Sequence, residues 1–109
     1  MGAVTFGIPK ELVCLITEYF KIDTFIETGT FNGKTAVWAS GLFRNVFTIE
    51  NSRQLYESAS GTLANYRNIQ HIFGNSALEL SKLISEIKSP AIFWLDAHWW
   101  PPVPLKDEC

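Results

Sequence analysis

Residues 24–35, TFIETGTFNGKT, constrain the fold of this chain more than any other stretch. A short apolar run ends in the acid Glu27, and a loop with two glycines, Gly29 and Gly33, precedes a helical pattern that starts near Lys34. A strand, an acid, a glycine loop and a helix in this order are typical of the first unit of a nucleotide-binding α/β sheet. The glycines let the backbone turn sharply, and the start of the helix offers unpaired N–H groups to polar ligand atoms.

The rest of the chain repeats this alternation of helix and strand. Helices that alternate with strands through short connections predict a parallel sheet. We therefore expect an α/β fold, a Rossmann-like parallel sheet with helices on both faces, truncated to about four strands. The 109 residues suit one small, partial domain that spans residues 1–109. The expected helices are 9–20, 34–43, 52–63 and 76–88, and the expected strands are 24–27, 45–50, 68–73 and 91–95.

Apolar residues at helical spacing predict which helix faces pack on the sheet. Ser76, with Glu79 three residues later, has the pattern of a capping box, so we expect Ser76 to be the N-cap of the last helix. The continuous apolar run AIFWL at 91–95 predicts a strand that is buried on both faces. The expected inward residues are Leu12, Val13, Leu15, Ile16, Tyr19 and Phe20 in the first helix and Leu78, Leu80, Leu83, Ile84 and Ile87 in the last.

Polar residues stand at the ends of the expected strands. Glu27, Glu50, Asn75 and Asp96 each end or closely follow one, and ligands bind at the carboxyl ends of parallel strands, so we expect these residues to converge. An acid at the entrance of the glycine loop would repel a pyrophosphate, which argues against NAD and favours a ligand with a positive amine or sulfonium group. His98 is a candidate general base, because an imidazole accepts a proton near neutral pH.

On these residues, the chain resembles the first half of a class I S-adenosylmethionine-dependent methyltransferase. Residues 27–33, ETGTFNG, are similar to the first motif of that family, acid-x-Gly-x-Gly-x-Gly, and depart from it at Phe31, where a glycine is usual. This version of the motif looks closest to that of the branch of sugar and small-molecule O-methyltransferases. The resemblance covers about residues 24–98. It implies methyl transfer from S-adenosylmethionine to an oxygen of a small-molecule acceptor.

The resemblance also implies roles for individual residues. Glu50, with Asn51 beside it, would bind the ribose hydroxyls, and Asn75 and Ser76 would lie beside the adenine. Asp96 resembles the acid of the fourth motif, which in some branches holds a divalent metal such as Mg²⁺ or orients the acceptor hydroxyl. Together with His98, Asp96 is therefore a candidate catalytic residue. The residues that would wrap the methionine end of the cofactor are Glu27, Thr28, Gly29, Thr30, Phe31 and Gly33.

Simpler interpretations stay open for the same residues. The two loop glycines can serve a tight turn alone, and Glu50 can be a solvated acid at a strand end. Asn75 and Asp96 can cap the elements that follow them, and His98 can be structural. At the level of function, the alternative is a non-catalytic module, derived from a methyltransferase, that binds a nucleoside or a partner. A half-domain that binds NAD or a nucleotide sugar is a third alternative, disfavoured by the acid in the loop.

Charge and hydropathy exclude several classes of partner. A formal charge of -2 and a pI of about 5.6 give no electrostatic reason to expect nucleic acid or an anionic membrane as partner. The apolar runs are far shorter than the roughly 20 residues of a membrane helix, and the first residues lack the pattern of a signal peptide. Cys14 and Cys109 form neither a disulfide framework nor a metal-ligand spacing, so a cytoplasmic location is expected.

The number of strands falls short of the family that the chain resembles. A complete fold of that family has a seven-stranded sheet, whereas this sequence supplies four strands. A half-sheet leaves apolar surface uncovered, which favours association. Three outcomes are open: a fragment of a longer enzyme, a homo-oligomer in which another copy completes the sheet, or a reduced relative. The fragment is preferred because a domain of this size has little core to spare.

Overall fold

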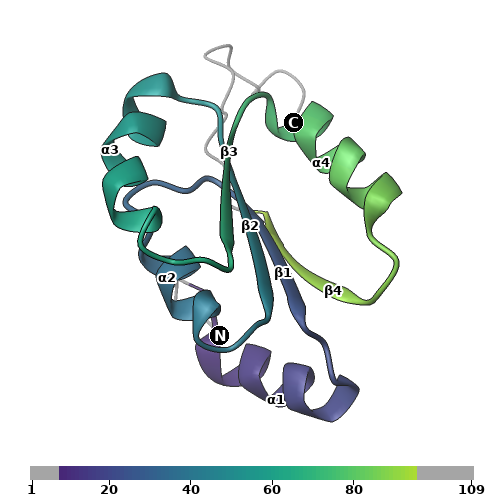
Figure 1. The fold of residues 1–109 in the computed structure, drawn as a ribbon. Helices are drawn as coiled ribbons and strands as arrows, with labels where there is room; N and C mark the ends of the chain where they lie inside the picture. The colour runs from purple at the N-terminus through teal and green to yellow at the C-terminus, as the bar shows by residue number, and fades with distance from the viewer. Residues whose placement is uncertain (1–7, 96–109) are drawn as a thin grey trace, which may run out of the picture.

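Four parallel strands form one sheet, in the order β3-β2-β1-β4, in the computed structural model of the chain, which describes residues 8–95 (Figure 1). The predicted alternation of helix and strand is confirmed, as is the Rossmann-like α/β fold. The elements are α1 (Lys10–Phe20), β1 (Thr24–Thr28), α2 (Lys34–Ser40), β2 (Asn45–Glu50), α3 (Arg53–Leu63), β3 (Ile69–Phe73), α4 (Ser76–Glu86) and β4 (Ala91–Leu95).

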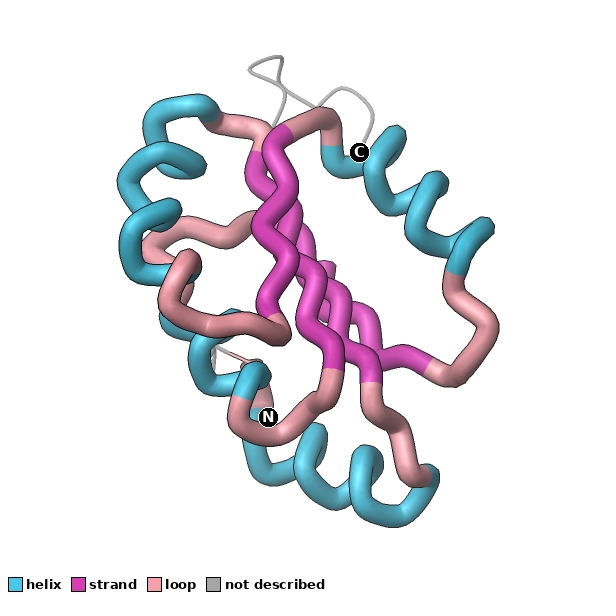
Figure 2. Tube along the Cα trace, viewed as in Figure 1, coloured by secondary structure: helices cyan, strands magenta, loops and turns pink. Residues whose placement is uncertain are grey.

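Helices cover both faces of the sheet. In Figures 1 and 2, α1, α2 and α3 lie on one side of the strands and α4 lies on the other. The core on the first side centres on Phe25 of β1, which is fully buried and contacts the rings of Phe43 and Trp38 at centroid distances of 5.1 and 6.3 Å. The smaller core on the second side joins Ile26 and Ile49 to Leu83 of α4. None of the helices in residues 8–95 has the length and apolar character needed to cross a bilayer.

The second helix ends earlier than predicted, at Ser40 instead of residue 43. After Ser40 the chain tightens into a turn, in which the N–H of Leu42 reaches back only three residues to the carbonyl of Ala39. The amide of Asn68 donates to the carbonyl oxygens of Ser40 and Phe43, at 2.8 and 3.0 Å. A side chain 25 or more residues away therefore satisfies the carbonyls that the helix end leaves open, which no local pattern indicates.

The N-cap of α4 is Asn75, so the prediction of Ser76 as the cap was wrong by one residue. The side-chain oxygen of Asn75 accepts the N–H of Leu78 at 3.0 Å, and Ser76 is the first helical residue. Asparagine and serine are about equally good caps, and an acid occurs near the start of the helix for either choice. Glu79 forms a 3.5 Å ion pair with Lys82.

The predicted burial of several apolar faces was wrong. In α1 the buried residues are Val13 and Thr17, whereas Leu15 and Tyr19 are 66% and 79% exposed. In α4, only Leu83 is buried. The other inward predictions that are exposed are Leu12, Phe20, Leu78 and Ile84. Helical spacing marks an apolar stripe, but it does not say whether another element covers that stripe.

The prediction that β4 is buried on both faces was also wrong. Phe93 and Leu95 of this strand are 42% and 62% exposed. Within residues 8–95, β4 pairs only with β1, so its other edge is the edge of the sheet. The single helix α4 on that face packs against residues of β1, β2, β3 and the start of β4, and it leaves the outer end of β4 uncovered.

Substitution by alanine should change the stability of the fold in opposite directions at two of the glycines. Gly33 has φ +85°, and a Cβ there would lie 3.0 Å from Cδ2 of the buried Leu63, so Gly33→Ala should destabilise the fold by about 1–2 kcal/mol. Gly61 lies inside α3 with open space around it, so Gly61→Ala should stabilise the fold by about 0.5–1 kcal/mol. Urea unfolding of both variants measures the difference. Equal effects would mean that the loop tolerates a side chain at Gly33.

Candidate functional site

The loop between β1 and α2 has an unusual backbone conformation. Gly29, Phe31 and Gly33 all have positive φ, at 87°, 51° and 85°. The N–H of Gly29 donates to the carbonyl of Ile49 at 2.8 Å, which ties the start of the loop to β2. A left-handed conformation costs a non-glycine residue about 1–2 kcal/mol. Phe31, the one departure from the motif, thus keeps the backbone conformation that favours glycine at this position.

Glu50, the last residue of β2, anchors this loop. Its side chain is only 3% exposed, and its two carboxylate oxygens accept the N–H groups of Phe31 and Ser52, each at 3.0 Å. The interpretation of Glu50 as a solvated strand-end acid was therefore wrong. A carboxylate oxygen has two lone pairs, so each oxygen keeps the capacity to accept a second hydrogen bond from a ligand.

Glu27 lies inside β1, since the strand continues to Thr28. It is 2% exposed, and its Oε2 atom accepts the hydroxyl of Thr48 at 2.7 Å. The Thr48 hydroxyl in turn lies 2.7 Å from that of Thr30 in the loop. Glu27 is thus held inside the sheet next to the loop, and its contact with a positively charged ligand group stays a prediction.

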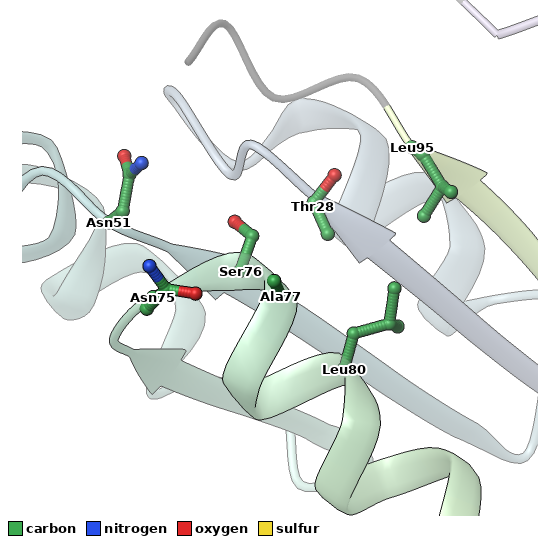
Figure 3. Close-up of a pocket in the computed structure, with 7 residues that line it drawn as sticks. All are labelled: Thr28, Asn51, Asn75, Ser76, Ala77, Leu80 and Leu95. Carbon is green, nitrogen blue, oxygen red and sulfur yellow. The ribbon is translucent and has the colours of Figure 1, made fainter.

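A pocket of about 300 Å³ opens at the carboxyl end of the sheet. Figure 3 shows its lining residues at the ends of β1 and β4, in the loop after β2 and at the start of α4. They are Thr28, Asn51, Asn75, Ser76, Ala77, Leu80 and Leu95. The Oγ of Ser76 is buried and has no hydrogen-bond partner among residues 8–95, so a polar ligand atom here would satisfy it. The pocket therefore joins a polar rim to an apolar wall.

The pocket brings together four of the predicted site residues: Thr28, Asn51, Asn75 and Ser76. The others in the described chain, which do not line it, are Glu27, Gly29, Thr30, Phe31, Gly33 and Glu50. The predicted catalytic residues Asp96 and His98, and with Asp96 the predicted Mg²⁺ site, lie outside the described residues. Within residues 8–95, no three His, Cys, Asp or Glu side chains gather closely enough to hold a metal ion.

The apolar wall of the pocket was not among the predicted parts of the site. Ala77, Leu80 and Leu95 form it. A signal was available, because Leu80 is four residues after Ser76 on the same helix and residues at this spacing lie on one face. Leu95 ends a strand at the same sheet edge as Thr28, its partner in the register of β1 and β4.

His71, on β3, should make folding stability depend on pH. Its ring stacks on Tyr56 with centroids 4.1 Å apart, and its Nε2 atom is buried without a hydrogen-bond partner among the described residues. Burial lowers the pKa of His71, and the negative charge of Glu50 partly opposes this. The unfolded chain therefore binds the proton more readily than the folded one, so stability should fall as the pH drops below about 6.5.

Replacing the imidazole with a phenyl ring tests this expectation. His71→Phe keeps a ring against Tyr56 and removes the titration. Urea unfolding at about pH 7.5 and about pH 5.5 should show a smaller loss of stability for the variant than for the wild type. The same loss in both chains would assign the pH dependence to other groups.

Solved structures that are similar to this chain include O-methyltransferases. TomG from Streptomyces achromogenes, in complex with S-adenosylmethionine (SAM), is 25% identical with a TM-score of 0.66, over 87% of this chain and 45% of that one. An O-methyltransferase from Bacillus cereus, in complex with S-adenosylhomocysteine (SAH), is 19% identical with a TM-score of 0.61, over 84% of this chain and 46% of that one.

This chain spans less than half the length of these two structures. Comparison of the sequence with protein-family models and with curated proteins gives no match in either. The similarity thus concerns the fold, and it extends over most of the chain. The chain has the fold of the class I S-adenosylmethionine-dependent methyltransferases.

Proposed function

We propose that this chain is the SAM-binding part of an O-methyltransferase that acts on a small molecule. The observation that carries the proposal is the pocket, which unites Thr28, Asn51, Asn75 and Ser76 at the carboxyl end of the sheet. This is where parallel α/β sheets bind ligands. The fold is that of O-methyltransferases crystallised with SAM and with SAH.

The chemistry of the pocket fits such a ligand. Ala77 and Leu80 offer an apolar wall of a kind that suits a purine ring, and Asn75 and Ser76 offer polar atoms beside it. Glu50 stands at the end of β2, directly before the pocket residue Asn51, where it would accept the ribose hydroxyls. The glycine loop would enclose the methionine end. SAM supplies a methyl group on a positive sulfur, and the residues of the chain bind and orient it.

Activation of the acceptor hydroxyl is the role that we propose for Asp96 and His98. Leu95, the residue directly before Asp96, lines the pocket. A carboxylate or an imidazole that takes the hydroxyl proton makes the oxygen a better nucleophile. The acceptor, a sugar or another small molecule with a hydroxyl, would meet parts of the site that these 88 described residues do not supply.

Calorimetric titration of the 109-residue chain with SAH tests the proposal. We expect saturable binding of SAH and none of NADH. Ala77→Phe, which fills the pocket, should weaken SAH binding at least about tenfold, equal to about 1.4 kcal/mol. Ser85→Phe, on an exposed turn of the same helix and away from the pocket, is the matched control and should bind like the wild type. A folded chain that binds no SAH would contradict the proposal.

The second candidate is a module that binds the nucleoside without turnover. It is favoured by Phe31, which stands in the loop where the family motif has a glycine. Incubation with SAM labelled in its methyl group and a panel of sugar and phenol acceptors separates the two candidates. Labelled acceptor identifies an enzyme and excludes the binding module.

A further inference from the structure

Thr48 is a polar residue in the middle of β2 that the proposed site does not use. It is fully buried, on a strand that also carries the buried Val46 and Ile49, and it does not line the pocket. A hydroxyl in such a place is costly unless it is hydrogen-bonded, and valine would fit the same β-branched shape without that cost. The hydroxyl of Thr48 is therefore expected to form hydrogen bonds that valine could not form.

The hydroxyl of Thr48 connects an acid of the sheet to the glycine loop. It donates to Oε2 of Glu27 at 2.7 Å and lies 2.7 Å from the hydroxyl of Thr30. A hydroxyl has only one proton to donate. With its proton directed to Glu27, Thr48 accepts from Thr30. The bonds thus run in one direction, from Thr30 through Thr48 to Glu27, and all three side chains are buried.

Two neighbouring loop residues are therefore fixed by two different acids. Thr30 is held by Glu27 through Thr48, and the N–H of Phe31 is held directly by Glu50. Thr30 also holds the loop internally, because its carbonyl accepts the N–H of Gly33 at 2.9 Å. Phe31, which lies between Thr30 and Gly33, has the left-handed conformation that a non-glycine residue avoids. Backbone strain of this kind persists only where surrounding contacts determine it.

We propose that Thr48 is a positioning residue, whose hydroxyl holds the glycine loop in the conformation that binds the ligand. The part of this inference that concerns the ligand rests on the proposed function. The part that concerns the loop does not, because it depends only on contacts within the chain. A preformed loop lowers the ordering cost of binding, so its effect should appear in ligand affinity as well as in loop dynamics.

Hydrogen exchange of single amides, measured by NMR, reports directly on how firmly the loop is held. Thr48→Val removes the hydroxyl and keeps the shape, so the amides of Phe31 and Gly33 should exchange about tenfold faster. SAH affinity should fall about fivefold in the same variant, by the loss of a buried hydrogen-bonded connection. Thr48→Ser keeps the hydroxyl, so it should restore both slow exchange and affinity. Rescue by serine is the result that a purely structural role for the threonine side chain would not give.

Two controls accompany these variants. The amide of Gly29, which bonds to the carbonyl of Ile49, does not depend on the Thr48 side chain and should keep its exchange rate. Thr24→Val removes another buried threonine hydroxyl at the opposite end of β1, where its partner is Asp23 at 3.2 Å. It should leave both the loop amides and SAH affinity unchanged. If Thr48→Val does not fold, Thr30→Val breaks the same connection from its loop end.

The outcomes separate this inference from the proposed function. A wild-type chain that binds no SAH contradicts the proposed function, and the exchange of the Phe31 and Gly33 amides then decides on Thr48 alone. Unchanged exchange in Thr48→Val would overturn the inference, whatever the affinity. Faster exchange with unchanged SAH affinity would also overturn it, because the hydroxyl would then shape the loop without serving the site.

Discussion

Glu50→Gln should weaken SAH binding at least tenfold, about 1.4 kcal/mol, and lower the free energy of unfolding by about 1–3 kcal/mol. The carboxylate accepts two backbone N–H groups, from Phe31 and Ser52, one on each oxygen. Glutamine has the same size but only one oxygen, so its amino group would face one of these donors. The site is buried, and a donor left there without an acceptor loses its solvation. Titration calorimetry and urea unfolding measure the two effects.

Glu57→Gln is the matched control for this substitution. Glu57 lies on α3, the next element after Glu50, and its ion pair with Arg53, at 3.7 Å, is well exposed. An exposed pair of this kind contributes about 0–1 kcal/mol, so affinity should not change and stability should change little. If Glu50→Gln behaved like Glu57→Gln, the proposed role of Glu50 in holding both loop and ligand would be wrong.

Much of the fold could be predicted from the sequence because local signals agree with one another. The loop at 29–33 has glycines where the backbone needs positive φ, at Gly29 and Gly33. Segments of four to six residues rich in apolar side chains, separated by helical patterns, placed each strand to within one residue at either end. These features depend on neighbours in the sequence, and such neighbours are visible in one sequence.

What the sequence could not predict depends on contacts between distant residues. The end of α2 is fixed by Asn68, which lies well over twenty residues away. Phe31 departs from the motif, yet it has the left-handed conformation that favours glycine, and Glu50 accepts its N–H. The burial of Glu50 likewise follows from the loop that folds over it. A single sequence gives the residue types at these positions but not the distances between them.

The candidate site could likewise be predicted only in part from the sequence. Strand ends predicted that Glu27, Glu50, Asn75 and Asp96 converge, and among the described residues of this set Asn75 lines the pocket. The resemblance supplied the other predicted residues that line it, Thr28, Asn51 and Ser76. The role of Thr48 could not be predicted, because a threonine in a strand is ordinary by its β propensity. Its significance comes from the Thr30 hydroxyl and the Glu27 carboxylate, which each lie 2.7 Å from the Thr48 hydroxyl.

Phe25→Ala should remove about 3–5 kcal/mol of stability and leave much of the chain unfolded at room temperature. Phe25 is fully buried, and its ring contacts those of Phe43 and Trp38, so alanine leaves a cavity that these side chains cannot fill. Circular dichroism and urea unfolding measure the loss. Should the variant be wholly unfolded, Phe25→Leu, with a smaller volume change, should show a measurable loss of about 1–1.5 kcal/mol.

Phe93→Ala is the informative comparison, because it removes the same side chain from another strand of the same sheet. Phe93 is 42% exposed on β4, whose outer edge pairs with no strand of residues 8–95, so the loss should be about 1 kcal/mol or less. A loss as large as that of Phe25→Ala would mean that this face is buried in solution. Repeating the measurement at tenfold lower protein concentration then identifies what buries it. A cost that shrinks on dilution indicates a second copy, since association depends on concentration, whereas a constant cost indicates burial within the chain itself.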